Sequence, residues 1–263
     1  MDETRLQTDF ESREALAEYV MAQSPWVTPA APSPHRGGRR AAEDRLAAIK
    51  PRRYGRTRNH LDGDVTRLSP YIRHGVVSLR EVYERAVELV TNPERCEKFI
   101  QELAWRDYWQ RVYAAHPEWI WSSIEPYKTG WSEAEYAPTL PEDVRAGETP
   151  SACINSFIHT LCDTGYLHNH ARMYLASYVV HWRRVSWQAG AKWMMAQLLD
   201  GDPASNNLSW QWVASTFSRK PYIFNLENVR RYTGASVDTR TETNRELDGS
   251  YADLSSRLFP HRR

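Results

Sequence analysis

The sequence predicts an all-α protein, a helical bundle, and three observations support that prediction. Apolar residues recur at helical spacing through most of the chain. No segment shows the alternation of apolar and polar residues that is typical of a half-buried strand. Helix boundary signals are present too, because Asp202 and Pro203 offer an N-cap acceptor and a proline at the first helical position. The segments with helical spacing are 39–50, 78–91, 94–115, 151–163, 166–183, 186–199 and 203–217.

The order of these segments predicts three parts of the chain. A short amphipathic helix over 10–23 and a proline-rich linker over 25–34 precede the main helical domain. After that domain the composition becomes polar, and we expect 233–250 to be a loosely held loop. The expected parts are an N-terminal helix and linker over 1–35, a helical domain over 36–232 and a polar tail over 233–263.

Charge and hydropathy limit the possible classes of protein. The formal net charge of the 263 residues is only +1, so the total charge does not indicate a nucleic-acid-binding protein. The stretch from Arg36 to Arg58 has nine Lys or Arg against two acids, and it is either a phosphate-binding surface or simply a solvated face. No apolar run approaches the ~20 residues that cross a bilayer, and Met1 to Phe10 are polar, without the apolar stretch of a signal peptide, so we expect a cytoplasmic protein.

Aromatic residues are the most unusual part of the composition. The chain has 11 Trp and 14 Tyr against 6 Phe. A core needs no polar atoms and would draw more on Phe, whereas Trp and Tyr suit sites that stack planar ligands. This excess favours a planar ligand.

Two helical segments place chemically useful side chains on one face. In FIQELAWRDYWQRVY, Trp105 and Arg106 follow Glu102 by three and four residues. This group is either a site or a surface ion pair beside a half-buried Trp. In GYLHNHARM, Asn169 and Met173 share a face in the same way.

Histidines in the second of these segments allow a metal-site alternative. His168 and His170, with His159 and Cys162, could suggest a zinc site or a nuclease triplet. A bare tripeptide lacks further ligands at metal spacing, so we assign no metal and expect histidines on a helix surface.

The segment LLDGDPASNNLSWQW is the most informative. Asp200 and Asp202 flank Gly201 in a tight acidic turn at a helix N-terminus, where they are either functional or only capping groups. Asn206 and Asn207 follow inside the helix, where Asn is intrinsically disfavoured and its amide is often used elsewhere.

These blocks resemble the signature blocks of the FAD-binding domain of photolyases and cryptochromes, in order and at similar spacing. FIQELAWRDYW, GYLHNHARM and LLDGDPASNNLSWQWVAST match three of them, while Tyr54 and VTRLSPYIRHGVVSLRE resemble the block that grips the phosphates. The similarity runs from about Gly37 to about Thr216. The family's N-terminal antenna domain has no counterpart here, so we expect no antenna chromophore.

The resemblance implies that FAD is the cofactor. Arg106 would pair with Asp200, Asp202 would meet the polar edge of the flavin, and Asn206 would face flavin N5. Val65 replaces the first Thr of the phosphate block and removes one hydroxyl. The full expected cofactor set is Tyr54, Thr66, Arg67, Leu68, Ser69, Phe99, Arg106, Asn169, Asp200, Asp202 and Asn206.

The resemblance also implies a substrate pocket and an electron relay. The residues that would contact a flipped pyrimidine dimer are Glu102, Trp105, Asn169, Met173 and Trp212. Arg172 would serve the DNA backbone or the mouth of the site, and His170 replaces a family Arg. Trp210 and Trp187 match the inner two members of the relay, and Trp131 is the nearest candidate for a third.

The implied function is light-driven repair of cyclobutane pyrimidine dimers in DNA by electron transfer from reduced FAD, the activity of a deoxyribodipyrimidine photolyase. One alternative is a cryptochrome-like blue-light photoreceptor or a DNA-binding flavoprotein without repair activity. A helical nucleic-acid-binding module that has lost FAD is a third. The expected partner is DNA, single- or double-stranded, that contains pyrimidine dimers.

Overall fold

The computed structural model describes residues 6–24, 32–90 and 92–262. They fall into two compact units, Met1–Arg36 and Gly37–Arg263. In the first unit the expected helix is confirmed as α1, Arg13–Gln23, which begins where the Ser12 hydroxyl accepts a hydrogen bond from the Ala15 N–H. Residues 25–31 of the expected linker lie outside the described residues.

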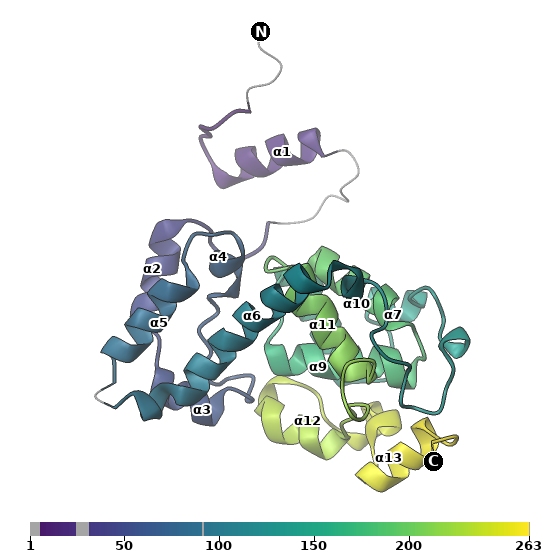
Figure 1. Ribbon diagram of the computed structural model, residues 1–263. Helices are drawn as coiled ribbons and strands as arrows, with labels where there is room; N and C mark the ends of the chain where they lie inside the picture. The colour runs from purple at the N-terminus through teal and green to yellow at the C-terminus, as the bar shows by residue number, and fades with distance from the viewer. Residues whose placement is uncertain (1–5, 25–31, 91, 263) are drawn as a thin grey trace. The chain divides into compact units, whose positions relative to one another are not determined.

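The second unit confirms the all-α prediction (Figure 1). Within the described residues no strand pairs into a sheet, and Ala137 and Val185 form an isolated bridge. Six 3-10 turns and one π turn, Tyr178–Trp182, join or extend the helices. The helices are α2 Arg39–Ala47, α3 Pro51–Thr57, α4 Ser69–Arg73, α5 Leu79–Glu88, α6 Glu97–Ala115, α7 Glu142–Ala146, α8 Ala152–Thr164, α9 Asn169–Ser177, α10 Trp187–Gln197, α11 Pro203–Ala214, α12 Leu226–Thr233 and α13 Tyr251–Leu258.

Local sequence explains most of these boundaries. Asp202 caps α11 by accepting from the Ser205 N–H, and Pro203 is its first residue, as expected. Gly165 ends α8 in the left-handed conformation, with φ of 68°. The segment expected as one helix over 39–50 ends instead at Ala47, and Pro51 starts a new helix because the residue before a proline avoids the α conformation.

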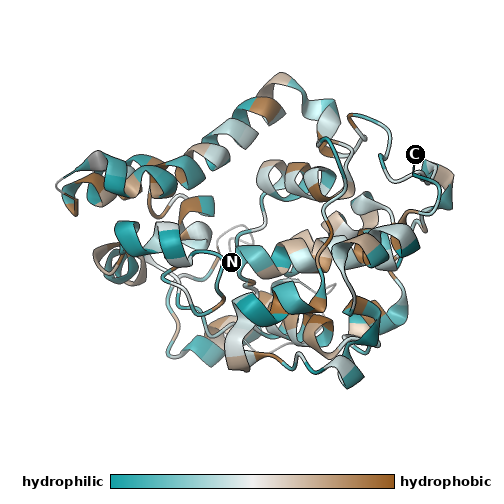
Figure 2. Ribbon diagram, turned by 90° about the horizontal axis from the view of Figure 1, so that it is seen from below, coloured by the Kyte–Doolittle hydropathy of each residue, from teal (hydrophilic) through white to brown (hydrophobic). Residues whose placement is uncertain are grey.

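Two hydrophobic cores build the second unit. One gathers α2 to α5 and the start of α6 around Leu68, Val82 and Phe99. The larger one gathers α8 to α12 around residues such as Phe157 and Trp187. Helix α6 packs against α3 and α5 near its start and against α11 further along, so it joins the two groups of helices (Figure 1). The helices carry both hydrophilic and hydrophobic stretches, as amphipathic helices do (Figure 2).

The polar segment after Thr233 is a loop with three 3-10 turns, as expected, but it is not loosely held. Asn244 is fully buried; its Oδ1 accepts from the Cys153 N–H and its Nδ2 donates to the carbonyls of Asp238 and Arg240. Leu247 is fully buried in the larger core. This mostly polar segment is ordered because the Asn244 amide is fully hydrogen-bonded inside the fold and apolar residues such as Leu247 pack into the core.

In the described part, the hydropathy of the helices and the absence of disulfides match what the composition indicates. None of these helices combines the length and the hydropathy of a bilayer span. Cys96, Cys153 and Cys162 form no disulfide among the described residues.

Candidate functional site

A cavity of about 560 Å³ lies between the two cores. Its volume is within the ~300–1,000 Å³ typical of small-molecule and cofactor sites. Leu68 and Phe99 of the smaller core and Met194 and Val213 of the larger core line it. The structure brings every expected cofactor residue to this cavity: Tyr54, Thr66, Arg67, Leu68, Ser69, Phe99, Arg106, Asn169, Asp200, Asp202 and Asn206.

The segment 65–69 forms one wall through an unusual backbone. Arg67 has a φ of 53°, in the left-handed region that residues with a side chain rarely adopt. The Thr66 hydroxyl accepts from the Leu68 N–H at 3.2 Å, and Leu68 is buried beneath the wall. Such strained positions concentrate at ligand sites, where surrounding contacts hold them.

The acidic turn at 200–202 forms a second wall, through Asp200 and Asp202. A side chain at Gly201 would place its Cβ 2.8 Å from the Met195 carbonyl oxygen, so only glycine fits. The Arg73 guanidinium donates to the Gly201 carbonyl at 2.7 Å, and the His74 ring bonds the Leu199 carbonyl at 2.9 Å. These bonds from the end of α4 tie the two walls together.

The partner of Asp200 differs from the expected one. The Arg172 guanidinium donates to both Asp200 carboxylate oxygens, at 3.0 and 2.9 Å, whereas no ion pair joins Arg106 to Asp200 in the described structure. The expected pairing is therefore wrong, and Arg172 is the cation that meets Asp200. Burial alone raises the pKa of Asp200, but Arg172 and Ser69 outweigh it and hold that pKa below its usual range.

Asp202 and Arg106 lie close to that pair. Both Asp202 oxygens accept from the Gln110 amide, at 2.8 and 2.9 Å, while Asp202 also caps α11. Burial lowers the pKa of Arg106, and Asp202 and Asp200 partly offset this. Arg106 lines the cavity as a cation without a carboxylate within ion-pair distance among the described residues.

The paired asparagines have their amides in use, as the sequence suggests. Asn207 is buried and donates from Nδ2 to the Ile120 carbonyl at 2.7 Å. Asn206 donates from Nδ2 to the Ala191 carbonyl and to Asn207 Oδ1, at 3.0 and 2.9 Å. Both N–H groups of Asn206 are thus committed, and its Oδ1 is left as an acceptor on a residue that lines the cavity.

The expected substrate residues line the same cavity. Glu102, Trp105, Asn169, Met173 and Trp212 are all among its lining residues. Glu102 forms ion pairs with Lys98 at 2.9 Å and Arg58 at 3.4 Å. The indoles of Trp105 and Trp212 are 44% and 39% exposed, so they mark where the cavity opens to solvent.

Two of the three expected relay tryptophans lie deeper. Trp210 lines the cavity and is almost fully buried. A Cβ at Gly190 would lie 2.3 Å from the Trp210 ring, so the indole packs on the bare backbone of α10. Trp187 is fully buried one turn earlier on α10, with its indole N–H donating to the Ser123 hydroxyl at 3.0 Å. Trp131 is partly buried, and its indole donates to the Leu258 carbonyl.

The histidines of GYLHNHARM are not on a helix surface, so that expectation is wrong. His168 is buried, and burial lowers the pKa of both His168 and His170 to about 4. At neutral pH His170 therefore brings no positive charge to the place of the family Arg. In the part of the chain that the structure describes, no three His, Cys, Asp or Glu side chains converge to hold a metal ion.

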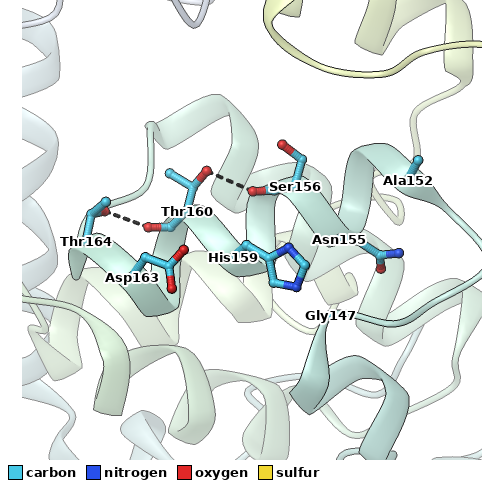
Figure 3. A pocket seen from close by; sticks show the side chains of 8 residues that line it. All are labelled: Gly147, Ala152, Asn155, Ser156, His159, Thr160, Asp163 and Thr164. Carbon is cyan, nitrogen blue, oxygen red and sulfur yellow. Dashed lines mark hydrogen bonds between the residues drawn. The ribbon is translucent and has the colours of Figure 1, made fainter. Parts of the chain in front are cut away.

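A second hollow lies along one side of α8 and carries no site. Figure 3 shows Asn155, His159 and Asp163 along its rim, with the Thr160 and Thr164 hydroxyls bonded to carbonyls of their own helix. These side chains do not converge on a common point (Figure 3).

Several cavity residues were not expected from the sequence. Arg58, Trp109 and Tyr166 all line the cavity. Trp109 lies four residues after Trp105 on α6, and Tyr166 is in the block GYLHNHARM, so spacing and position could have indicated both. Arg58 follows α3, between Tyr54 and the block that begins at Val65, and the fold brings it to Glu102.

Comparison with known proteins identifies the family. The family model described as the FAD-binding domain of DNA photolyase matches residues 99–245, more than half of the chain. The chain belongs to this family. The match extends beyond Thr216, where the recognised resemblance stops, and the tail up to Arg245 is therefore part of the family's domain.

Individual relatives agree with this assignment. A deoxyribodipyrimidine photo-lyase of Streptomyces griseus is 37% identical over 158 residues, which cover 59% of this chain and 33% of that protein. One of Halobacterium salinarum is 30% identical over 199 residues, which cover 72% of this chain and 41% of that protein. The chain thus spans about a third of the length of the curated relatives it matches.

Solved structures of the family share the fold. An archaeal photolyase of Sulfolobus tokodaii, described with two FAD molecules, has a TM-score of 0.63 and 26% identity, covering 87% of this chain and 51% of that one. A cryptochrome of Synechocystis has a TM-score of 0.71 over 90% of this chain and 54% of that one, at 19% identity, which shows the fold alone.

The photolyase FAD-binding domain takes FAD as its cofactor, and the residues of this chain fit that group. Aromatic and apolar side chains for a ring system and cationic side chains for phosphates line the same cavity. Ser205 Oγ, a buried atom of the cavity lining, has no hydrogen-bond partner in the described structure. Unpaired buried hydroxyls are costly, so this one suits a cavity that receives a polar ligand.

Proposed function

We propose that this chain repairs cyclobutane pyrimidine dimers in DNA in a light-driven reaction that uses reduced FAD. The observation that supports it most is the position of Trp105 and Trp212 at the mouth of the cavity that Asn206 and Asp200 line. One cavity can therefore serve a flavin at its base and a pair of bases at its opening. When bound, reduced FAD supplies the photoexcited electron that opens the dimer.

The cofactor residues would divide the work of binding FAD. Arg67 and Ser69 would hold the pyrophosphate and ribityl region, with the strained backbone at Arg67 as part of the grip. The Arg172–Asp200 pair would fix the polar edge of the ring site. Asn206, with both N–H groups committed, would present Oδ1 as an acceptor, which suits the ring N–H of a reduced flavin.

The substrate residues would receive a dimer flipped out of the helix. The two indoles would wedge the fused bases, and Met173 would supply an adaptable apolar wall. Glu102 would accept a hydrogen bond from a base N–H. Because Lys98 and Arg58 already pair with Glu102, that contact would bring no uncompensated negative charge beside a dimer that receives an electron.

Trp210 and Trp187 would relay electrons to the flavin when it must be reduced again. Trp210 lines the cavity, and Trp187 is on the face of α10 that packs against Trp210 through Gly190. The proposal has three further parts: the protein acts on DNA, it works in the cytoplasm, and it is a photolyase-like lyase.

A direct repair assay tests the proposal. Protein with bound, chemically reduced FAD is mixed with oligothymidylate that contains dimers and is then illuminated with blue light. Repair restores the base absorbance near ~260 nm, and none returns in the dark. No light-dependent recovery despite bound FAD would defeat repair and favour the photoreceptor, for which the loss of a phosphate-block hydroxyl at Val65 is the supporting observation.

A further inference from the structure

A continuous row of aromatic rings extends from the mouth of the cavity over the neighbouring surface. Trp105 stacks on Trp109 with ring centroids 5.3 Å apart, Trp109 contacts Phe217 at 5.8 Å, and Phe217 contacts Trp119 at 6.2 Å. His116 stacks on Trp119 at 3.7 Å, nearly parallel at 8°. We call Trp109, Phe217, Trp119 and His116 the aromatic ledge.

The ledge joins two chain segments on one rigid support. Trp109 and His116 come from α6 and its end, Trp119 from the turn that follows, and Phe217 from the segment after α11. The fully buried Gln211 side chain donates to the carbonyls of Trp119 and Ser122 and accepts from the Ile124 N–H. The rings are therefore held in place before any ligand arrives, which lowers the entropic cost of binding.

Each residue of the ledge is only partly buried, so the core does not cover this row of rings. Trp109 itself lines the cavity, so the ledge begins where the proposed dimer pocket ends. Planar faces that continue from such a pocket suit the bases next to the dimer. A core-packing role alone does not account for a row of rings that all stay partly accessible to solvent from the pocket outwards.

Positive charge accompanies the ledge. Arg219 and Lys220 are exposed, two and three residues after Phe217, and the structure gives neither an ion pair among its described residues. The Ser218 hydroxyl lies within hydrogen-bond distance of the carbonyls of Trp212 and Lys220, at 2.8 and 2.9 Å, and its one O–H can donate to either, which orders this loop beside the dimer pocket. Free cations beside stacked rings are the combination that binds the backbone and bases of single-stranded nucleic acid.

We propose that the aromatic ledge binds the unpaired DNA bases that flank the dimer, with Arg219 and Lys220 on their phosphates. The ledge stacks bases that are already unpaired, so the protein prefers single-stranded over double-stranded DNA. The inference rests on the proposed function for its substrate, but the ledge binds undamaged single strands too, and this separates the two tests.

The test uses undamaged, fluorescently labelled oligothymidylate and the flavin-loaded protein, with affinity measured by anisotropy. Trp119→Ala and Phe217→Ala should each weaken binding roughly 5- to 100-fold, because a base stacked on an aromatic ring is worth that much. Trp121→Ala is the control, since Trp121 is a surface indole of the same segment, 45% exposed, and makes none of the ring contacts of the ledge. Its affinity should equal that of the unchanged protein.

A second variant avoids any loss of folding. Arg219→Ala with Lys220→Ala changes only exposed side chains, and it should reduce the slope of log affinity against log salt by about 1.4, from two phosphate contacts on a single strand. If the ledge variants bind oligothymidylate as Trp121→Ala does, or weaken duplex binding as much as single-strand binding, the inference is wrong. If the unchanged protein shows no repair but the ledge variants still lose single-strand affinity, the ledge stands and the repair function fails.

Discussion

Asp200 and Arg172 are the residue pair on which the base of the cavity depends most. Asp200 is almost fully buried, so loss of Arg172 leaves a carboxylate without its main cationic partner. We expect Arg172→Ala to lower the free energy of unfolding by about 3–5 kcal/mol in urea titrations. The double variant Arg172→Ala with Asp200→Asn should recover part of this loss, and equal stability of the two variants would contradict the pairing.

Three buried histidines make stability depend on pH. Burial lowers the pKa of His168, His170 and His181 to about 4, below their usual value near 6.5. The unfolded chain therefore takes up protons between pH 6.5 and 4 that the folded protein does not, so this stability is complete above pH 6.5 and is lost as the pH falls towards 4. We expect the melting temperature to fall steadily over that range.

His181 isolates this effect because it is fully buried and is not among the residues that line the cavity. His181→Asn should reduce the pH slope of the unfolding free energy near pH 5 by about 1 kcal/mol per pH unit. An unchanged slope would show that this histidine is protonated in the folded protein.

At the scale of single residues, the sequence predicted which residues line the cavity better than it predicted which of them pair with one another. All eleven cofactor candidates line the cavity, because their blocks fix which helix face each residue shares with its neighbours. The partner of Asp200 depends on how closely α6 and α9 approach α11. Spacing along the chain does not contain that distance, and the family resemblance implied Arg106 as the partner where the structure has Arg172.

The acidic turn is an element whose shape requires one glycine. Gly201→Ala would bring a Cβ within 2.8 Å of the Met195 carbonyl, and the backbone would have to move. We expect a loss of about 1–3 kcal/mol of stability and weaker FAD retention on gel filtration. Gly37→Ala is the control, because nothing lies within 4 Å of its Cβ position. Equal flavin content in both variants would argue against a role for the turn in binding.

Helices α10 and α11 together carry the proposed electron relay. Trp187→Phe keeps an aromatic ring in the core but removes an easily oxidised indole. We expect light-driven reduction of oxidised flavin to slow to a small fraction of its rate, while repair with chemically reduced flavin is unchanged. Transient absorption measures the first rate. An unaltered rate would exclude Trp187 from the relay.

At the scale of elements, periodic helices were predictable and polar connections were not. The segments that became α5, α6, α8, α10 and α11 have apolar residues at helical spacing, and Asp202 with Pro203 marked a start correctly. The segment 233–250 was expected to be loosely held, but the buried amide of Asn244 anchors it, as apolar residues anchor other segments. A polar composition does not reveal which amide will be satisfied inside the fold.

The two cores explain how the whole second unit should respond to its cofactor. A ligand between them binds the folded state alone and stabilises it by about 2.7 kcal/mol at a hundred times its dissociation constant. For a chain of this size that raises the melting temperature by roughly 5–10 °C, measured by calorimetry with and without FAD. An unchanged melting temperature would show that FAD does not bind the folded protein.

The whole account depends on one cavity that serves both a flavin and a dimer. The most direct measurement is made on Trp105→Ala with Trp212→Ala, which changes only the mouth. Flavin content and light-driven dimer repair are followed in the same sample. The account predicts that FAD stays bound while repair is lost, and either loss of FAD or unchanged repair would contradict it.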